Sequence, residues 1–183
     1  MKIAQVTALL LMALALPAAG RDCPPPLPFA EEKAALLEML QATRDESAGR
    51  FLTLELDGLW SVPPDAEAAA LVERGITLRD EDRLDVSEAA FDALLAYCPG
   101  FVAGYDQRAR TRMLAGNMDG ALADLEIAAD LAPDNAAIWG AQAVVLMAMG
   151  RFGPADTALD RGLALNPWLP ERRLRLAPPG VAM

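Results

Sequence analysis

Residues 102–135 read VAGYDQRARTRMLAGNMDGALADLEIAADLAPDN, and residues 136–169 read AAIWGAQAVVLMAMGRFGPADTALDRGLALNPWL. Aligned without a gap, the two stretches place Pro133 above Pro167, so the proline recurs after 34 residues. An internal repeat of this length is typical of proteins that stack one small structural unit on the next. The repeat therefore decides the fold class.

The repeat extends one unit upstream, because Pro99 lies 34 residues before Pro133. Further columns on the same period join Leu71, Tyr105 and Trp139; Gly75, Ala109 and Ala143; Leu84, Met118 and Phe152; Ser87, Ala121 and Ala155; and Phe91, Leu125 and Leu159. Large residues at helical spacing fill the space between helices, and the small-residue columns let neighbouring helices approach closely. We therefore expect a pair of helices in each unit.

The helix boundaries within the units are marked by residues with special backbone roles. Gly116 and Gly150 stand where a first helix must stop, a position suited to a left-handed cap residue. Asp85 and Glu88 are spaced as a capping box, which predicts the start of a second helix. The prolines then block continuation of each second helix and turn the chain toward the next unit.

On these columns, residues 68–169 resemble three tetratricopeptide repeats, and the last two units fit best. The first unit, residues 68–101, departs from the pattern at two positions. Arg74 stands where the family has an apolar residue, and Asp82 stands where the other two units have glycine. The resemblance implies an all-α fold, in which antiparallel helix pairs stack into a right-handed superhelical solenoid with a concave inner surface.

The first twenty residues are typical of a signal peptide. Lys2 supplies a positive start, residues 3–16 form a mostly apolar run, and residues 17–20 supply the small residues of a cleavage site. The apolar run is shorter than the roughly 20 residues of a membrane span. We expect cleavage near Gly20, a periplasmic or secreted mature chain, and no stable membrane insertion of that chain.

The rest of the chain divides around the repeats. We expect a proline-rich tether and a helical N-terminal cap in residues 21–64, the repeats in residues 65–169, and a short C-terminal cap and tail in residues 170–183. Residues 30–43 have the pattern of an amphipathic helix. Residues 51–60 alternate as a strand does, but no partner strand is near, so a second helix is expected there.

The two cysteines, Cys23 and Cys98, predict a disulfide, because an even count in an oxidising compartment favours pairing. Such a bond would tie the proline-rich segment to the repeats and stabilise the fold by roughly 2–4 kcal/mol. The competing interpretation is two separate thiols, with Cys98 buried as a small apolar residue.

Charge and composition argue against several classes of function. The net charge of −10 opposes binding to nucleic acid and to anionic lipid. The sequence has no histidine, so its serines lack the commonest activating base. The sequence also shows no metal-ligand spacing and no glycine-rich phosphate loop. We therefore predict no enzymatic activity, no metal site and no cofactor.

The resemblance implies a ligand-binding surface on the first helices of the repeats, which line the concave face. Carried onto this sequence, the partner-binding residues are Glu73, Ile76, Asp106, Gln107, Arg110, Met113, Gly140, Val144 and Met147. This face suits a peptide or helix with a polar anchor beside an apolar stretch. The family's lysine and asparagine clamp for a C-terminal carboxylate is absent. The competing interpretation is a solvated face with ordinary packing.

Arg108 and Arg112 lie four residues apart, on one face of a predicted helix. A buried arginine must be paired, because an uncompensated buried charge costs several kcal/mol. The candidate partners are Glu88, Asp92, Asp119 and Asp124. We therefore expect these two arginines to be structural, whereas Arg110 points away from them and suits a ligand contact.

Together these features predict an exported scaffold or adaptor that binds a protein or peptide partner through the concave face. The alternative is a structural subunit of an envelope assembly, which would self-associate into a homo-oligomer.

Overall fold

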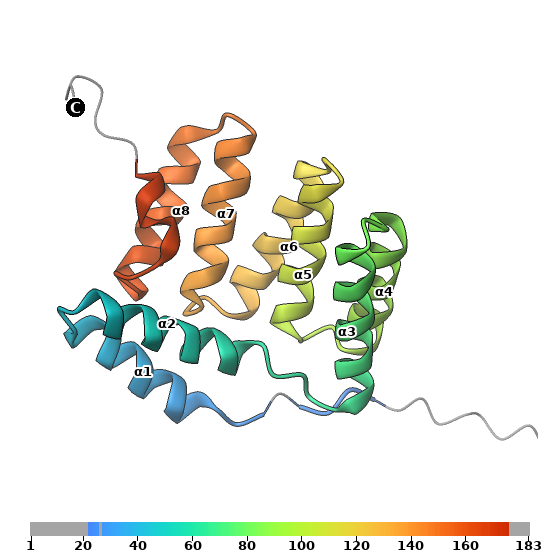
Figure 1. The fold of residues 1–183 in the computed structure, drawn as a ribbon, viewed down its shortest axis with the longest axis horizontal. Helices are drawn as coiled ribbons and strands as arrows, with labels where there is room; N and C mark the ends of the chain where they lie inside the picture. Colours follow the sequence, from blue (N-terminus) through green and yellow to red (C-terminus); the bar gives the residue numbers. More distant parts are fainter. Residues whose placement is uncertain (1–21, 26, 176–183) are drawn as a thin grey trace, which may run out of the picture.

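The computed structural model describes residues 22–25 and 27–175. Within these residues it contains eight α-helices, one 3-10 helix and no strand. The elements are α1 (Ala30–Ala42), α2 (Glu46–Trp60), α3 (Ala66–Asp80), α4 (Leu84–Tyr97), α5 (Val102–Leu114), α6 (Met118–Leu131), α7 (Ala136–Ala148), α8 (Phe152–Leu165) and the 3-10 helix η1 (Pro170–Leu174). The all-α fold predicted from the repeat is confirmed (Figure 1).

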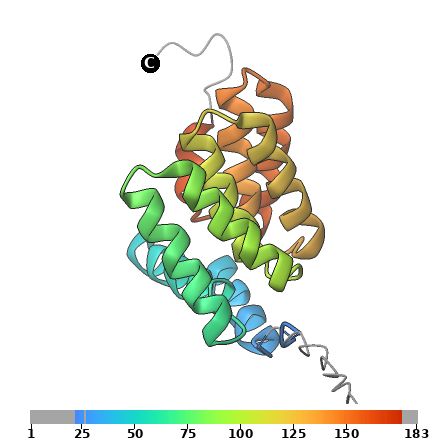
Figure 2. The same cartoon turned by 90° about the vertical axis from the view of Figure 1, so that its right-hand side faces the viewer.

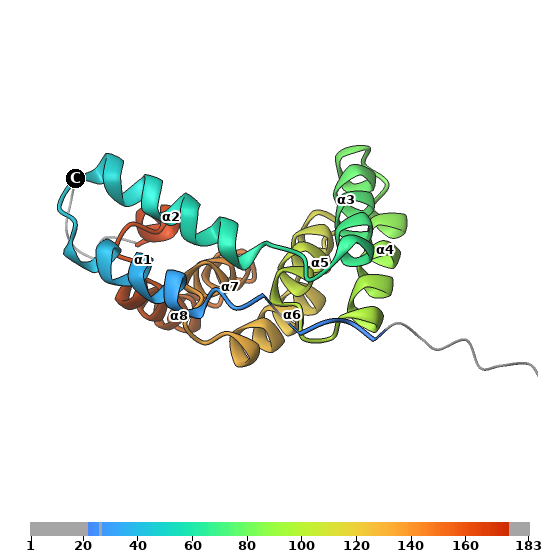
Figure 3. The same ribbon diagram turned by 90° about the horizontal axis from the view of Figure 1, so that it is seen from below.

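The helices of the repeat region stack in pairs along the molecule. The most extensive contacts join α3 with α4, α5 with α6, and α7 with α8, and further contacts join α4 with α5 and α6 with α7. Figures 1 and 2 show the pairs side by side. Contacts of α5 with α3 and with α7 make these three first helices an inner layer. In the view from below, this layer lies on the side of α2 (Figure 3).

Left-handed residues end the first helix of each pair. Gly116 and Gly150 have φ values of 79° and 72°, as expected for glycine after a helix C-terminus. Asp82 occupies the same place in the first pair with a φ of 58°. The turn therefore keeps the same left-handed geometry although aspartate replaces glycine, and the aspartate side chain makes this conformation less favourable.

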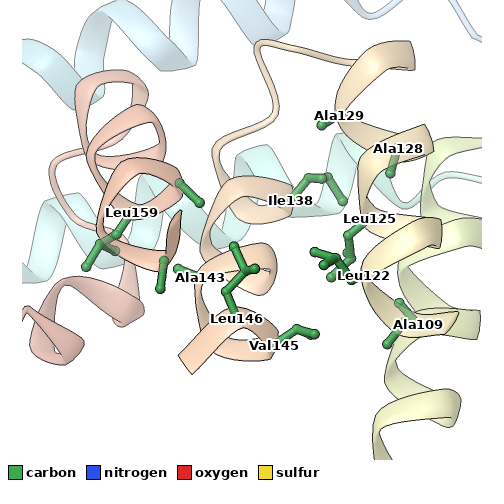
Figure 4. Packing of buried hydrophobic residues seen from close by; sticks show 13 residues of the cluster. Ala109, Leu122, Leu125, Ala128, Ala129, Ile138, Ala143, Val145, Leu146 and Leu159 are labelled. Carbon is green, nitrogen blue, oxygen red and sulfur yellow. The ribbon is translucent and has the colours of Figure 1, made fainter. Parts of the chain in front are cut away.

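The core follows most of the repeat columns, but in the column of Leu84 and Met118 the third residue, Phe152, is 54% exposed and does not fill the space between helices as expected. Phe91, Leu125 and Leu159 are buried, with at most 1% of their surface exposed. A Cβ added to Gly75 would stand 2.5 Å from the ring of Phe91, so the small residue in this column is required for the close approach of α3 and α4. Figure 4 shows the main cluster, in which Ile138 of α7 lies against Leu125 of α6.

The N-terminal segment forms α1 and α2, so residues 51–60 are helical as predicted. Leu52 and Leu56 are buried, whereas Leu54 is 70% exposed. The apparent strand alternation therefore reflects three leucines of one helix, two on its packed face and one on its open face. Asp45 caps α2 by accepting a hydrogen bond from the Ala48 N–H at 2.7 Å.

The position of these two helices differs from that of a cap stacked on the first repeat. They run across the repeats and contact the C-terminal end of the chain (Figures 1 and 3). Gln41 Nε2 donates to the carbonyl oxygens of Ala164 and Leu165, both at 2.8 Å. Asn166 Nδ2 donates to Thr53 Oγ1 at 2.9 Å inside the protein. The N-terminal helices thus connect the last pair of helices to the first.

The connection to the first pair is the predicted disulfide. Cys23 and Cys98 are bonded, with their Cα atoms 5.1 Å apart, and Cys98 directly follows α4. This finding confirms the pairing and rules out the alternative of two separate thiols.

Two other expectations concern the ends of the chain. The predicted signal peptide, residues 1–20, and the tail, residues 176–183, lie outside the described residues. Among the residues that are described, no helix has the length and apolar character to cross a membrane. Near the C-terminal end of the described residues, Leu169 is 1% exposed, and Leu174 packs against the main cluster.

Candidate interaction groove

The inner layer of helices, α2 and the C-terminal segment together enclose a groove of about 570 Å³, which we call the inner groove. It is lined by side chains of α2, α3, α5 and α7 and of the segment around η1: Asp57, Arg79, Arg110, Met113, Leu114, Ala137, Ala141, Val144, Leu169, Pro170 and Glu171. This volume lies within the range of sites that hold small ligands or single side chains of a partner.

One wall of the inner groove is apolar. Met113 and Leu114 at the end of α5 line the groove together with Ala141 and Val144 of α7. Leu114 is 65% exposed, so most of its apolar side chain is open to a partner. The small alanines of α7 keep this wall open, because larger side chains would fill it.

The other part of the inner groove is charged. Arg110 Nε donates to Asp106 at 2.8 Å, one helical turn away, and the arginine side chain stays 54% exposed. Arg79 Nη1 donates to Gln107 Oε1 at 2.8 Å and to the Gln107 carbonyl oxygen at 3.3 Å. Both arginines are thus held by groups of α5.

Burial and neighbouring charges perturb ionisation in the inner groove. The pKa of Asp57 is raised from 3.8 to about 6, chiefly by burial, and the charges of Glu171 and Asp106 contribute to the rise while Arg110 opposes it. Asp106 in turn raises the pKa of Arg110 above its ordinary value. Burial lowers the pKa of Arg79. Three carboxylates and two arginines therefore share one electrostatic environment.

The nine predicted partner-binding residues lie in several different surroundings. Arg110, Met113 and Val144 line the inner groove. Asp106 and Gln107 stand next to it and hold its arginines.

The other four predicted residues lie outside this space. Ile76 and Met147 pack against hydrophobic clusters. Glu73 is exposed in a separate shallow hollow of α3. Gly140 is buried beneath Glu171, whose Oε2 would stand 2.8 Å from an added Cβ.

Four lining residues lie outside the first helices, on which the sequence analysis placed the binding surface: Asp57, Leu169, Pro170 and Glu171. They come from the N-terminal helices and from the end of the last unit and the segment after it. Their contribution depends on the return of α2 and η1 to the concave side. No column of the repeat carries a signal for that return.

The two arginines predicted to be structural form an ion-pair network. Arg108 donates to both oxygens of Asp124, at 3.0 and 2.7 Å, and Arg112 donates to Asp124 at 2.8 Å. Asp92 pairs with Arg108 at 2.6 Å, and Glu88 with Arg112 at 2.8 Å. Asp124 is 1% exposed, so its charge depends on these two partners. The network joins α4, α5 and α6, and the prediction of structural pairing is confirmed.

A second hollow, of about 560 Å³, lies beside the proline-rich tether. Its walls include Leu27, Trp60, Phe101 and Leu131, and Lys33 Nζ lies 3.4 Å from the centre of the Trp60 ring. In the part of the chain that the structure describes, no cluster of three or more acidic or cysteine side chains is arranged to hold a metal ion.

Comparison with known proteins agrees with the repeat. A family model for the tetratricopeptide repeat matches residues 112–175. No curated protein matches the chain significantly.

Several solved structures share the fold. The first such domain of Spaghetti (RPAP3), bound to the HSP90 peptide SRMEEVD, matches with a TM-score of 0.57 and 18% identity, over 61% of this chain and 90% of that chain. The type III secretion chaperone SycD of Yersinia enterocolitica, with a peptide of the translocator YopD, matches with a TM-score of 0.55 and 15% identity, over 60% and 84%. A repeat protein of Parabacteroides merdae matches with a TM-score of 0.55 and 16% identity, over 79% and 57%.

Proposed function

We propose that this chain, a tetratricopeptide-repeat protein, is an exported scaffold that binds a segment of a partner protein in its inner groove. The observation that carries the proposal is the inner groove itself, where the exposed Leu114 lies beside the half-exposed Arg110. A concave surface with an apolar wall and a few placed charges is the usual form of a peptide-binding site.

The solved structures support this use of the fold. The RPAP3 domain holds a peptide of HSP90, and SycD holds a peptide of YopD. The same architecture therefore accommodates peptides of two different proteins. The proposal concerns binding and assigns no catalytic step to the residues that line the groove.

The disulfide supports export. A structural disulfide between Cys23 and Cys98 persists in an oxidising compartment and is rare in the cytosol of most cells. The sequence of residues 1–20 adds the pattern of a signal peptide. Mass spectrometry of the protein from its own cells tests this part: we expect a chain that begins near Arg21 with both cysteines oxidised. A full-length, reduced chain would contradict it.

Affinity capture with groove variants tests the binding proposal. The mature chain, residues 21–183, is used to capture proteins from the envelope fraction of its own cells. The groove variant is Arg110→Ser with Leu114→Ser. The matched control is Arg151→Ser with Phe152→Ser, because this pair also combines an exposed arginine with an exposed apolar residue, Phe152 being 54% exposed, outside the inner groove.

We expect the wild-type chain and the control to capture the same partner and the groove variant to lose it. A partner held equally by all three proteins would contradict the inner groove as the binding site. Circular dichroism of each variant confirms that the helices are intact.

Self-association remains a second candidate function, because Phe51 and Leu54 of α2 are adjacent on one face and are 61% and 70% exposed. Light scattering over a range of concentrations tests it. A mass that rises with concentration, and does not rise for Phe51→Ser with Leu54→Ser, would support it, and a constant monomer mass would exclude it.

A further inference from the structure

We propose that the partner segment carries a lysine or arginine next to a large apolar side chain, so that the cation meets the carboxylates of the inner groove while the apolar group covers Leu114. This inference rests on the proposed function and specifies the chemistry of the occupant.

The first argument is where the carboxylates come from. Asp57 belongs to α2, Asp106 to α5 and Glu171 to η1, yet all three act on the same space. Each reaches it from a different direction, because α2 and η1 return to the concave side of the repeats. Three separate elements thus place negative charge in one partly buried groove, where a charge is screened less than at an open surface.

The second argument is that the cations already present are engaged. Arg110 directs its Nε to Asp106, and Arg79 is held by Gln107. The side chains of Asp57 and Glu171 form no hydrogen bond or ion pair with another described residue. The charged residues that line the groove, Asp57, Glu171, Arg79 and Arg110, balance one another when all are ionised, and Asp106 beside the groove adds one negative charge in excess. The net charge of −10 on the whole chain acts in the same direction.

The third argument is the apolar wall beside these charges. Leu114 is 65% exposed, and Met113 and Val144 stand next to it without closing over it. An apolar side chain of a partner would cover Leu114 and remove its surface from water. A segment that combines this side chain with a cation would satisfy both parts of the inner groove at once.

An acidic segment fits less well. Arg110 and Arg79 keep further N–H donors, but an acidic segment that approached them would also approach Asp106, Asp57 and Glu171, which repel it. Selection of acidic peptides is therefore the outcome that would speak against this inference.

The test is selection from a random displayed peptide library against the whole mature chain. The selected peptides are then measured, by fluorescence anisotropy, against three variants. Leu114→Asp blocks the apolar wall. Asp57→Asn with Glu171→Gln removes the two unpaired carboxylates. Glu126→Gln with Asp130→Asn makes the same change of net charge on the exposed face of α6, outside the inner groove.

We expect the groove-dependent peptides to share a lysine or arginine beside a large apolar residue. Their affinity should fall about tenfold in the Asp57 and Glu171 variant and stay within about twofold in the Glu126 and Asp130 control. Peptides that need Leu114 but are acidic or uncharged would overturn this inference and leave the proposed function standing. If no selected peptide depends on Leu114, the proposed function fails as well.

Discussion

At the scale of single residues, Asp57 is the side chain whose ionisation the fold opposes most clearly. Its pKa is raised from 3.8 to about 6 by burial, with Glu171 and Asp106 adding to the effect. Between these two pH values the folded chain holds a proton that the unfolded chain releases. The contribution of Asp57 therefore lowers the free energy of unfolding as the pH rises from about 4 to 6, and the full penalty applies above that window.

The variant Asp57→Asn is predicted to be more stable than the wild type at neutral pH by about 1–2 kcal/mol, after allowance for solvent screening. This advantage should shrink at about pH 5, where the wild-type carboxyl is mostly protonated in the folded chain. Urea unfolding at the two pH values measures the difference, with the exposed Asp130→Asn as the control. An advantage that is equal at both pH values would contradict the assignment.

Asp82 gives a second test at this scale. It takes the left-handed conformation that glycine takes at Gly116 and Gly150. The variant Asp82→Gly is predicted to raise the free energy of unfolding by about 0.5–1 kcal/mol, because glycine adopts this conformation without strain. Gly116→Ala is predicted to lower it by a similar amount. Thermal unfolding of both variants checks the pair, and a less stable Asp82→Gly would show that the aspartate side chain itself stabilises the turn.

At the scale of elements, the network around Asp124 holds α4, α5 and α6 together. Removing its carboxylate would leave Arg108 and Arg112 facing one another, with only 15% and 18% of their side chains exposed. Asp124→Ala is therefore predicted to lower the free energy of unfolding by about 3–5 kcal/mol. Asp92→Ala, at the 54% exposed end of the network, should cost less than about 1 kcal/mol. Similar losses in both variants would contradict the central role of Asp124.

The helices from α3 to α8 could be predicted from the sequence because each column of the repeat places residues of similar size and polarity at the same position in all three units. Phe91, Leu125 and Leu159 are one such column, and all three are buried. The path of α1 and α2 could not be predicted in this way. It depends on single contacts such as Thr53 with Asn166, 113 residues apart, which have no counterpart elsewhere in the chain.

The same distinction between repeat helices and non-repeating segments applies to the residues of the candidate site. Arg110, Met113 and Val144 lie on first helices, and the resemblance to the repeat family placed them on the concave side. Asp57 and Glu171 belong to elements outside the repeats. Glu171 covers Gly140, which the sequence analysis had predicted to contact a partner. A repeat pattern specifies the face that first helices present. It carries no information about non-repeating segments that return to that face.

At the scale of the whole molecule, the N-terminal helices close the repeat stack on itself. The disulfide joins the segment before α1 to the residue after α4. At the other end, Gln41 of α1 donates to α8, Thr53 of α2 accepts from Asn166, and Trp168 packs closely on Gly49 of α2. In a repeat stack each unit contacts only its neighbours, so these contacts add links that the repeats by themselves do not supply. The inner groove lies inside this closed arrangement, because α2, the first helices and the segment around η1 all line it.

The variant Cys23→Ser with Cys98→Ser removes the disulfide, which links two residues 75 positions apart in the sequence. We predict a loss of about 2–4 kcal/mol in the free energy of unfolding. Amide exchange should accelerate most in α1 and α2 and least in the cluster around Leu125 and Leu159. Uniform acceleration throughout the chain would show that the disulfide stabilises the repeats as a whole and not the attachment of the N-terminal helices.

The central claim is that a partner segment occupies the inner groove, and site-specific photo-crosslinking in the protein's own cells tests it most directly. A photoreactive residue replaces Leu114 in one chain and Phe152 in another; these residues are 65% and 54% exposed, inside and outside the groove. The account predicts a discrete crosslinked partner from position 114 and none from position 152. Crosslinks from position 152 alone, or from neither position, would contradict it.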